Sequence, residues 1–221
     1  MHLTFAALLA LQAAPGPDTM PSVTPVRAAA CEPRRTNLGG IGQASVVAFT
    51  GAIFGDRVCA TVANLALDTV GARIADDPPA DALAVAPLGN GTGATLVLSG
   101  DALSVVAADA APPGGSVTAP AGPFAIAPGG RIPNFGGDTA AEPRVVLAYA
   151  GQRLLLIATS PVTLVDLARA LRDQPDLFGA DAVERAVVLA GGAQASLLLR
   201  AADGTLGAIA PAARYLTLSK R

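Results

Sequence analysis

The feature that most constrains this fold is a series of short apolar segments in the C-terminal third, broken by glycine-rich turns. Residues 144–149 and 153–159 are both apolar and of strand length, and the turn-forming stretch 150–152 separates them. This arrangement predicts a β-hairpin. A third apolar segment, 185–189, runs into a Gly-Gly pair and is followed by the strand-like stretch 196–200. The series therefore predicts antiparallel strands joined by tight turns.

One helix signal interrupts these segments, at Thr163. Asp166 follows three residues later, so the two side chains form a capping box in which each satisfies a backbone N–H at the helix start. Apolar residues then recur on a single helical face, at Leu164, Leu167, Ala168 and Leu171. Pro175 prevents much continuation. The pattern predicts a helix over residues 163–173.

The remaining chain is also rich in short apolar stretches, and 52% of its 221 residues are apolar. Strand-like segments occur at 44–49, 58–63 and 94–98, and the 24 glycines and 18 prolines suit the turns between them. We predict an α+β fold with a mostly antiparallel sheet and one or two packed helices. A single domain is expected over residues 31–221, after a leader over residues 1–30.

The N-terminus favours export. Residues 2–14 are apolar but too few to span a bilayer, and small residues follow before a break at Pro15. This is typical of a signal peptide, which predicts a periplasmic or extracellular protein without a transmembrane segment. In such a protein Cys31 and Cys59 often form a disulfide; the alternative is two unpaired cysteines in the core.

Several kinds of chemistry are excluded by composition. A formal net charge of −2 offers no electrostatic basis for binding nucleic acid. The only histidine is His2, in the leader, so Ser-His catalysis and histidine-based zinc sites are excluded, and we expect no metal or cofactor. The glycine-rich stretch 89–93 precedes a strand-like segment and not a helix, which favours a tight turn over a phosphate-binding loop.

Beyond these signals, residues 119–199 resemble the phosphodiester glycosidase family. The matching features are the order of residues 160–173 before a strand ending in Gly191-Gly192, and the upstream stretches 121–126 and 129–133. The resemblance implies hydrolysis of a sugar linked through a phosphodiester, as in the family's exopolysaccharide-associated bacterial relatives. It also implies a sugar-phosphate or polysaccharide ligand.

The family resemblance places the substrate-binding site at the Gly-Gly turn and the neighbouring arginine strand. Arg144 suits a phosphate, because its guanidinium is a permanently charged fork, and the glycines allow close approach of the backbone. The remaining candidate contacts are polar residues of the turn, Gln194 and Ser196. The family's turn carboxylate is replaced by Ala190, and an alanine side chain can neither accept a proton nor bind a sugar hydroxyl.

The absence of the family's carboxylate leaves two hypotheses for the function of the chain. In the first, the chain is an exported hydrolase whose carboxylate comes from elsewhere, for example from Asp138 or Glu142. In the second, it is a pseudoenzyme that keeps the fold as a non-catalytic binding or scaffolding protein of the cell envelope. The distinguishing observation is whether Asp138 or Glu142 lies within hydrogen-bonding reach of Gly191.

Overall fold

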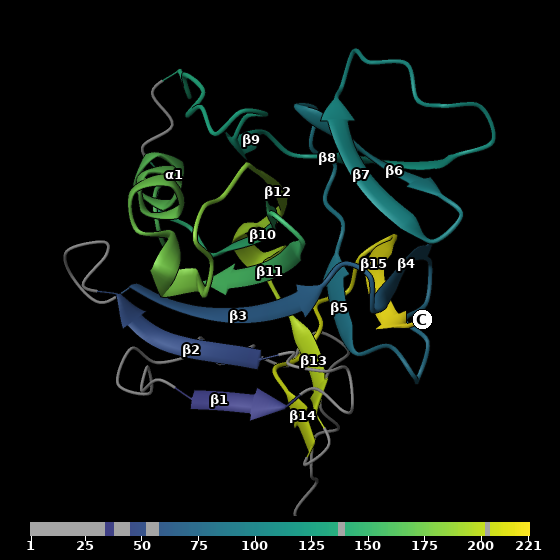
Figure 1. Cartoon of the computed structure of the whole chain (residues 1–221), viewed down its shortest axis with the longest axis horizontal. Coiled ribbons are helices and arrows are strands. Elements are labelled where there is room, and N and C mark those ends of the chain that lie inside the picture. The colour runs from purple at the N-terminus through teal and green to yellow at the C-terminus, as the bar shows by residue number, and fades with distance from the viewer. Residues whose placement is uncertain (1–33, 38–44, 52–57, 137–139, 202–203) are drawn as a thin grey trace, which may run out of the picture.

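The architecture consists of three antiparallel sheets and one α-helix within the described residues (Figure 1). The computed structural model of the chain describes residues 34–37, 45–51, 58–136, 140–201 and 204–221. The expected leader over residues 1–30 and Cys31 lie outside these ranges. Cys59 is disulfide-bonded and is therefore not an unpaired core thiol.

The largest sheet has seven strands in the order β1-β2-β3-β11-β10-β12-β9. Its strands are β1 (Arg34–Asn37), β2 (Ser45–Gly51), β3 (Val58–Ala66), β9 (Phe124–Ile126), β10 (Arg144–Ala150), β11 (Arg153–Thr159) and β12 (Arg185–Gly191). The expected hairpin is confirmed as β10 and β11, which pair from Val145 opposite Ala158 to Ala150 opposite Arg153. Gly151 in the turn adopts a φ of 57°, which favours glycine.

Two smaller sheets lie against one face of the large sheet. The first has five strands in the order β14-β13-β5-β15-β4, and the second has three in the order β7-β6-β8. Their strands are β4 (Val70–Ala75), β5 (Ala84–Pro87), β6 (Ala94–Ser99), β7 (Ala102–Ala107), β8 (Val117–Ala121), β13 (Leu198–Ala201), β14 (Gly204–Leu206) and β15 (Tyr215–Lys220). The expected strand after residues 89–93 is confirmed as β6.

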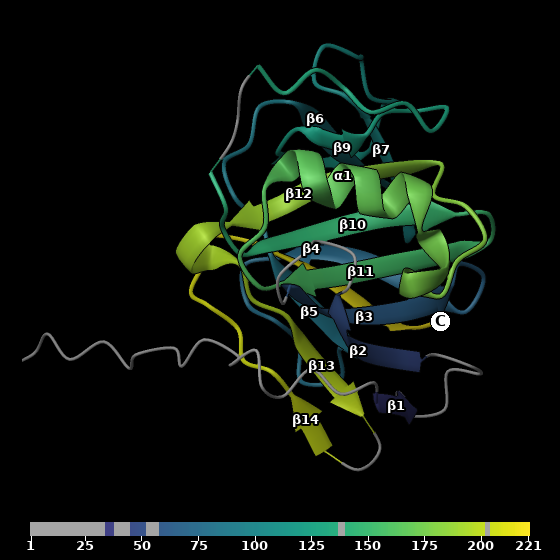
Figure 2. The same ribbon diagram turned by 90° about the vertical axis from the view of Figure 1, so that its left-hand side faces the viewer.

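The helix α1 (Leu164–Asp173) covers the other face of the large sheet, in front of β12 and β10 (Figure 2). Thr163 is its N-cap and accepts a hydrogen bond of 3.1 Å from the backbone N–H of Asp166. The second hydrogen bond of the expected capping box differs. The Asp166 carboxylate accepts from the Thr163 hydroxyl at 2.7 Å and not from the Thr163 backbone N–H. The predicted apolar face is buried. A 3₁₀ turn, η3 (Pro175–Phe178), begins at the proline that ends the helix.

The central strands are buried on both faces. Residues such as Val146 and Ile157 pack beneath α1, whereas Val145 and Leu156 pack against the two smaller sheets. In an antiparallel sheet with one solvent-exposed face, apolar and polar residues alternate along each strand. Since β10 and β11 have no wet face, their sequences read as continuous apolar runs.

The expected α+β class is wrong, because the protein is nearly all-β. One ten-residue α-helix stands against fifteen strands in the described part of the chain. The physical reason is that, among the residues the structure describes, only 163–173 combine a cap with helical periodicity, so no other described segment supplies a second helical layer. The second face of the large sheet is therefore covered by further sheets.

Candidate functional site

The expected Gly-Gly turn lies at the end of β12, beside the start of β10. Gly191 pairs with Arg144 in the ladder, and the N–H of Gly192 donates to the Pro143 carbonyl at 2.9 Å. The chain then enters the 3₁₀ turn η4 (Gly192–Gln194). Gly192 has a φ of 60°, a conformation that side chains disfavour. The turn and the first residues of β10 thus form one connected unit.

The carboxylate of Glu142 lies on this turn. A methyl group at Gly191 would be 2.7 Å from Glu142 Oε1, and one at Gly192 would be 3.4 Å from Oε2. The Glu142 side chain is 39% exposed, so solvent and ligands reach it. The structure therefore brings one of the two proposed carboxylates to the turn. The other, Asp138, lies outside the described residues.

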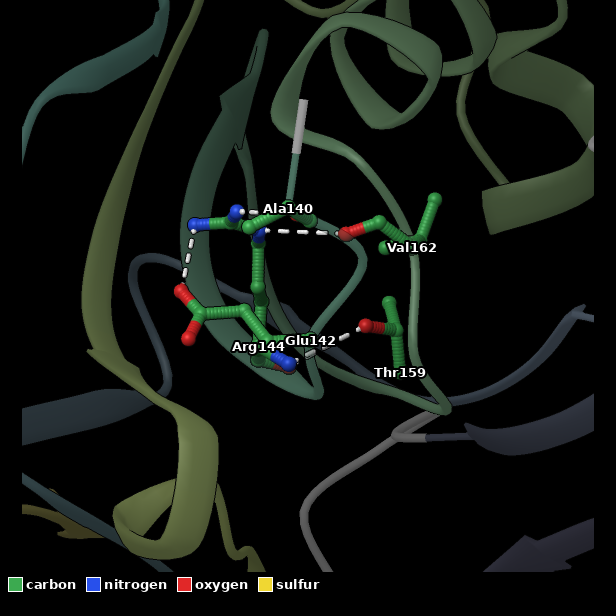
Figure 3. Close-up of polar contacts among 5 residues, drawn as sticks. All are labelled: Ala140, Glu142, Arg144, Thr159 and Val162. Atoms are coloured by element: carbon green, nitrogen blue, oxygen red, sulfur yellow. Dashed lines mark hydrogen bonds and ion pairs between the residues drawn. The ribbon is translucent and has the colours of Figure 1, made fainter. Parts of the chain in front are cut away.

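Arg144 is buried beneath Glu142, with its side chain only 5% exposed (Figure 3). Its Nη1 lies 3.0 Å from Glu142 Oε1. Nε donates to the Val162 carbonyl and Nη2 to the Ala140 carbonyl, each at 3.3 Å. Its backbone N–H also donates to Thr159 Oγ1 at 3.2 Å. Arg144 thus connects the strand start, the loop before α1 and the carboxylate.

The other two expected substrate contacts, Gln194 and Ser196, lie in different settings: one at the surface and one within the hydrogen bonds of the turn. The side chain of Gln194 is exposed. The Ser196 hydroxyl accepts from the Ala210 N–H at 2.7 Å and donates to the Gln194 carbonyl at 3.4 Å. Ser196 therefore fixes the shape of the turn, and Gln194 presents a free amide end to the surroundings.

Ala190 does not share the face of Glu142. Successive strand residues point to opposite faces, and Gly191 faces Glu142. Ala190 instead opposes Val145, which packs toward the smaller sheets, and it is 4% exposed. A register shift in this ladder lies between Val145 and Val146. Glu142 thus approaches the turn from the face opposite to residue 190.

The stretch 89–93 also reaches this turn, which the sequence did not predict. The Gly89 N–H donates to the Leu189 carbonyl at 2.8 Å, and a methyl group at Gly89 would lie 3.8 Å from Gln194 Oε1. Gly91 is packed so closely on the backbone of Gly122 that a side chain there would overlap it. The glycines signalled a tight turn, but local sequence carries no information about which distant backbone a loop contacts.

No metal centre or membrane-spanning helix is found in the part of the chain that the structure describes. None of its helices has the length and apolar character needed to cross a bilayer. No group of three or more His, Cys, Asp or Glu side chains there is arranged to hold a metal ion.

The fold is similar to that of a solved phosphodiester glycosidase domain. A solved structure with this architecture is the zebrafish N-acetylglucosamine-1-phosphodiester alpha-N-acetylglucosaminidase catalytic domain, auto-inhibited by pro-peptide. The TM-score is 0.54 at 12% identity, and the match covers 86% of this chain and 88% of that chain. No family model and no curated protein sequence matches the chain. The expected resemblance is thus confirmed at the level of the fold.

Proposed function

We propose that this protein is a divergent phosphodiester glycosidase-like hydrolase that acts on a sugar-phosphate diester at the cell envelope, with Glu142 as its carboxylate. The observation that carries the proposal is the contact of Glu142 with Gly191 and Gly192. The family's own carboxylate position is Ala190. A glutamate packed against this turn can supply an acid–base or nucleophilic group there, although it approaches from the face opposite to Ala190.

The chemistry of the substrate suits a site with one carboxylate. Glycosidases ordinarily use two, one of which protonates the leaving oxygen. When the bond between the anomeric carbon and a phosphate oxygen breaks, the leaving group is a phosphate monoester, which is stable as an anion. It needs little help from a general acid. Glu142 then acts either as a base that takes a proton from the attacking water, or as a nucleophile at the anomeric carbon whose glycosyl ester is afterwards hydrolysed by water.

The proposed sugar contacts are Gly191, Gly192 and Gln194. The glycines let a ligand approach the backbone, and the exposed amide of Gln194 can both donate to and accept from a sugar hydroxyl. Ser196 links the backbone carbonyl of Gln194 to the backbone N–H of Ala210 and so holds the backbone that carries Gln194. Export to the envelope is proposed from the apolar leader, residues 2–14.

A non-catalytic envelope binding protein is the second candidate. Two observations favour it: Ala190 lacks a carboxylate, and the Arg144 guanidinium is occupied by Glu142, Val162 and Ala140. Under this hypothesis the turn binds a sugar-phosphate or polysaccharide without cleaving it.

The test is release of free sugar from a sugar-phosphate diester by the purified protein, by Glu142→Gln and by Ala190→Asp. Glu184→Gln is the matched control, because Glu184 accepts from Gly151 at the far end of the β10–β11 hairpin. The hydrolase proposal expects turnover by the native protein, retained in Glu184→Gln and lost in Glu142→Gln. Turnover that survives Glu142→Gln contradicts the role of Glu142.

If none of the proteins releases sugar but the native protein still binds the diester, the second candidate is correct. Turnover by Ala190→Asp alone would identify a decayed enzyme.

A further inference from the structure

The guanidinium of Arg144 is turned into the protein and away from the surface of the turn. Its three nitrogens each have an internal partner: the carboxylate of Glu142 and the carbonyls of Val162 and Ala140 (Figure 3). The side chain is 5% exposed, against 39% for Glu142. A phosphate that bound this guanidinium would have to displace partners that already occupy all three nitrogens, and one of them, the Val162 carbonyl, belongs to a buried residue.

Arg144 also lies where three segments join. Its backbone N–H donates to Thr159 at the end of β11, and its Nε donates to Val162, just before the N-cap of α1. Glu142 and Val162 form an isolated bridge, with N–H to carbonyl distances of 3.3 and 3.0 Å. The backbone of Glu142 is therefore held by Val162, and its side chain is held by Arg144.

The Glu142 carboxylate lies between Arg144 and the turn. On one side Arg144 Nη1 holds Oε1 at 3.0 Å. On the other side the same oxygen would be 2.7 Å from a methyl group at Gly191, so only glycine leaves room for it. The N–H of Gly192 is bound to Pro143, between the two charged residues in sequence. The charge pair and the turn thus hold each other in register.

We infer that Arg144 is a positioning residue that fixes the Glu142 carboxylate on the Gly191-Gly192 turn, and that it is not the phosphate ligand of the site. The kinetic part of this inference rests on the proposed function. Reactive groups displaced by about 1 Å can lose about a hundredfold in rate. A positioning role therefore affects turnover through Glu142, whereas a phosphate ligand would affect substrate binding directly.

The kinetic experiment compares the native protein, Arg144→Lys, Glu142→Gln and the double variant. Lysine keeps the charge but cannot present the planar fork that reaches three partners. A positioning role predicts that Arg144→Lys lowers kcat by about ten- to a hundredfold, leaves KM within about twofold, and does not weaken binding of the diester in the Glu142→Gln background, where turnover is lost. A rise in KM with kcat unchanged, or weaker binding of the diester by the double variant than by Glu142→Gln, overturns the inference.

A matched control and a second measurement keep the inference separate from the proposed function. Arg185→Lys is the matched control, because Arg185 is another partly buried arginine that donates to a backbone carbonyl, that of Val105. Arg185 lies at the end of β12 far from the turn, so the variant should leave kcat and KM unchanged. If the native protein releases no sugar, the proposed function fails, and amide hydrogen exchange decides the inference. Arg144→Lys should speed exchange about tenfold or more at Gly192 and Val162, but not at Leu83, which is bound to Leu218 in a smaller sheet. Unchanged exchange at the first two amides overturns the inference.

Discussion

At the scale of single residues, the site depends on the absence of a side chain at Gly191. Its φ of −138° is extended backbone that any residue adopts, so backbone conformation does not require glycine there. The requirement comes from Glu142, whose Oε1 occupies the space that a side chain would take. Gly192 differs, because its φ of 60° is itself unfavourable for other residues.

Gly191→Ala should therefore reduce activity more than stability. The added methyl group displaces the flexible end of Glu142, so we expect sugar release to fall about ten- to a hundredfold. The free energy of unfolding should change by less than about 1 kcal/mol, because only an exposed side chain has to move. Sugar-release assays and urea denaturation measure the two effects. Gly114→Ala is the control, since a methyl group there meets nothing within 4 Å. Full activity in Gly191→Ala would mean that the position of Glu142 is unimportant.

At the scale of elements, α1 is the element with the clearest local signals, and its cap adjoins the site. Thr163 caps the helix immediately after Val162, whose carbonyl accepts from Arg144. The buried face of α1 packs in one cluster with residues of the large sheet, including those of β9. The helix start thus fixes the loop that holds the arginine, which couples helix stability to the geometry of the turn.

Removing the cap should destabilise the protein measurably. Thr163→Ala loses the hydrogen bond to the Asp166 N–H, and we expect a loss of about 1 kcal/mol in the free energy of unfolding. Urea denaturation followed by circular dichroism measures it. Thr163→Ser retains the accepting oxygen and should stay close to the native value. Equal losses in the two variants would mean that the hydroxyl does not act as a cap.

At the scale of the whole molecule, the sheets are joined by a few polar contacts as well as by the core. The Tyr149 hydroxyl, on β10 of the large sheet, donates to the Leu103 carbonyl on β7 at 3.0 Å. Arg185 lies over the Tyr149 ring, 5.5 Å from its centroid, and donates to the Val105 carbonyl. Burial raises the pKa of Tyr149 well above its usual value, and nearby Arg185 only partly offsets this.

This shift predicts an alkaline limit to stability. Because the pKa of Tyr149 is raised by folding, its contribution is complete below the unfolded pKa of about 10 and is lost as the pH rises above it. Tyr149→Phe should be less stable than the native protein by about 1 kcal/mol at pH 8. The difference should close by about pH 11, since one pH unit above the unfolded pKa costs the native protein about 1.4 kcal/mol. Urea denaturation at both pH values measures the difference. Tyr215, the only other tyrosine, is common to both proteins and does not contribute to the difference between them. A difference that stays constant with pH would contradict the shift.

The local elements of this protein follow from short-range signals in its sequence. The α1 helix followed from Thr163, Asp166 and the apolar spacing, the β10–β11 hairpin from two apolar runs around Gly151, and the site turn from Gly191-Gly192. These signals act between residues a few positions apart, so the sequence displays them directly. Only the tertiary structure decided that further sheets cover the second face of the large sheet. It also decided that Glu142 lies on the turn and that Arg144 points inward to Val162 and Ala140. Those outcomes depend on contacts between strands distant in sequence. Any residue can supply a backbone carbonyl that accepts a hydrogen bond from a side chain, so the identity of the residue does not reveal the contact.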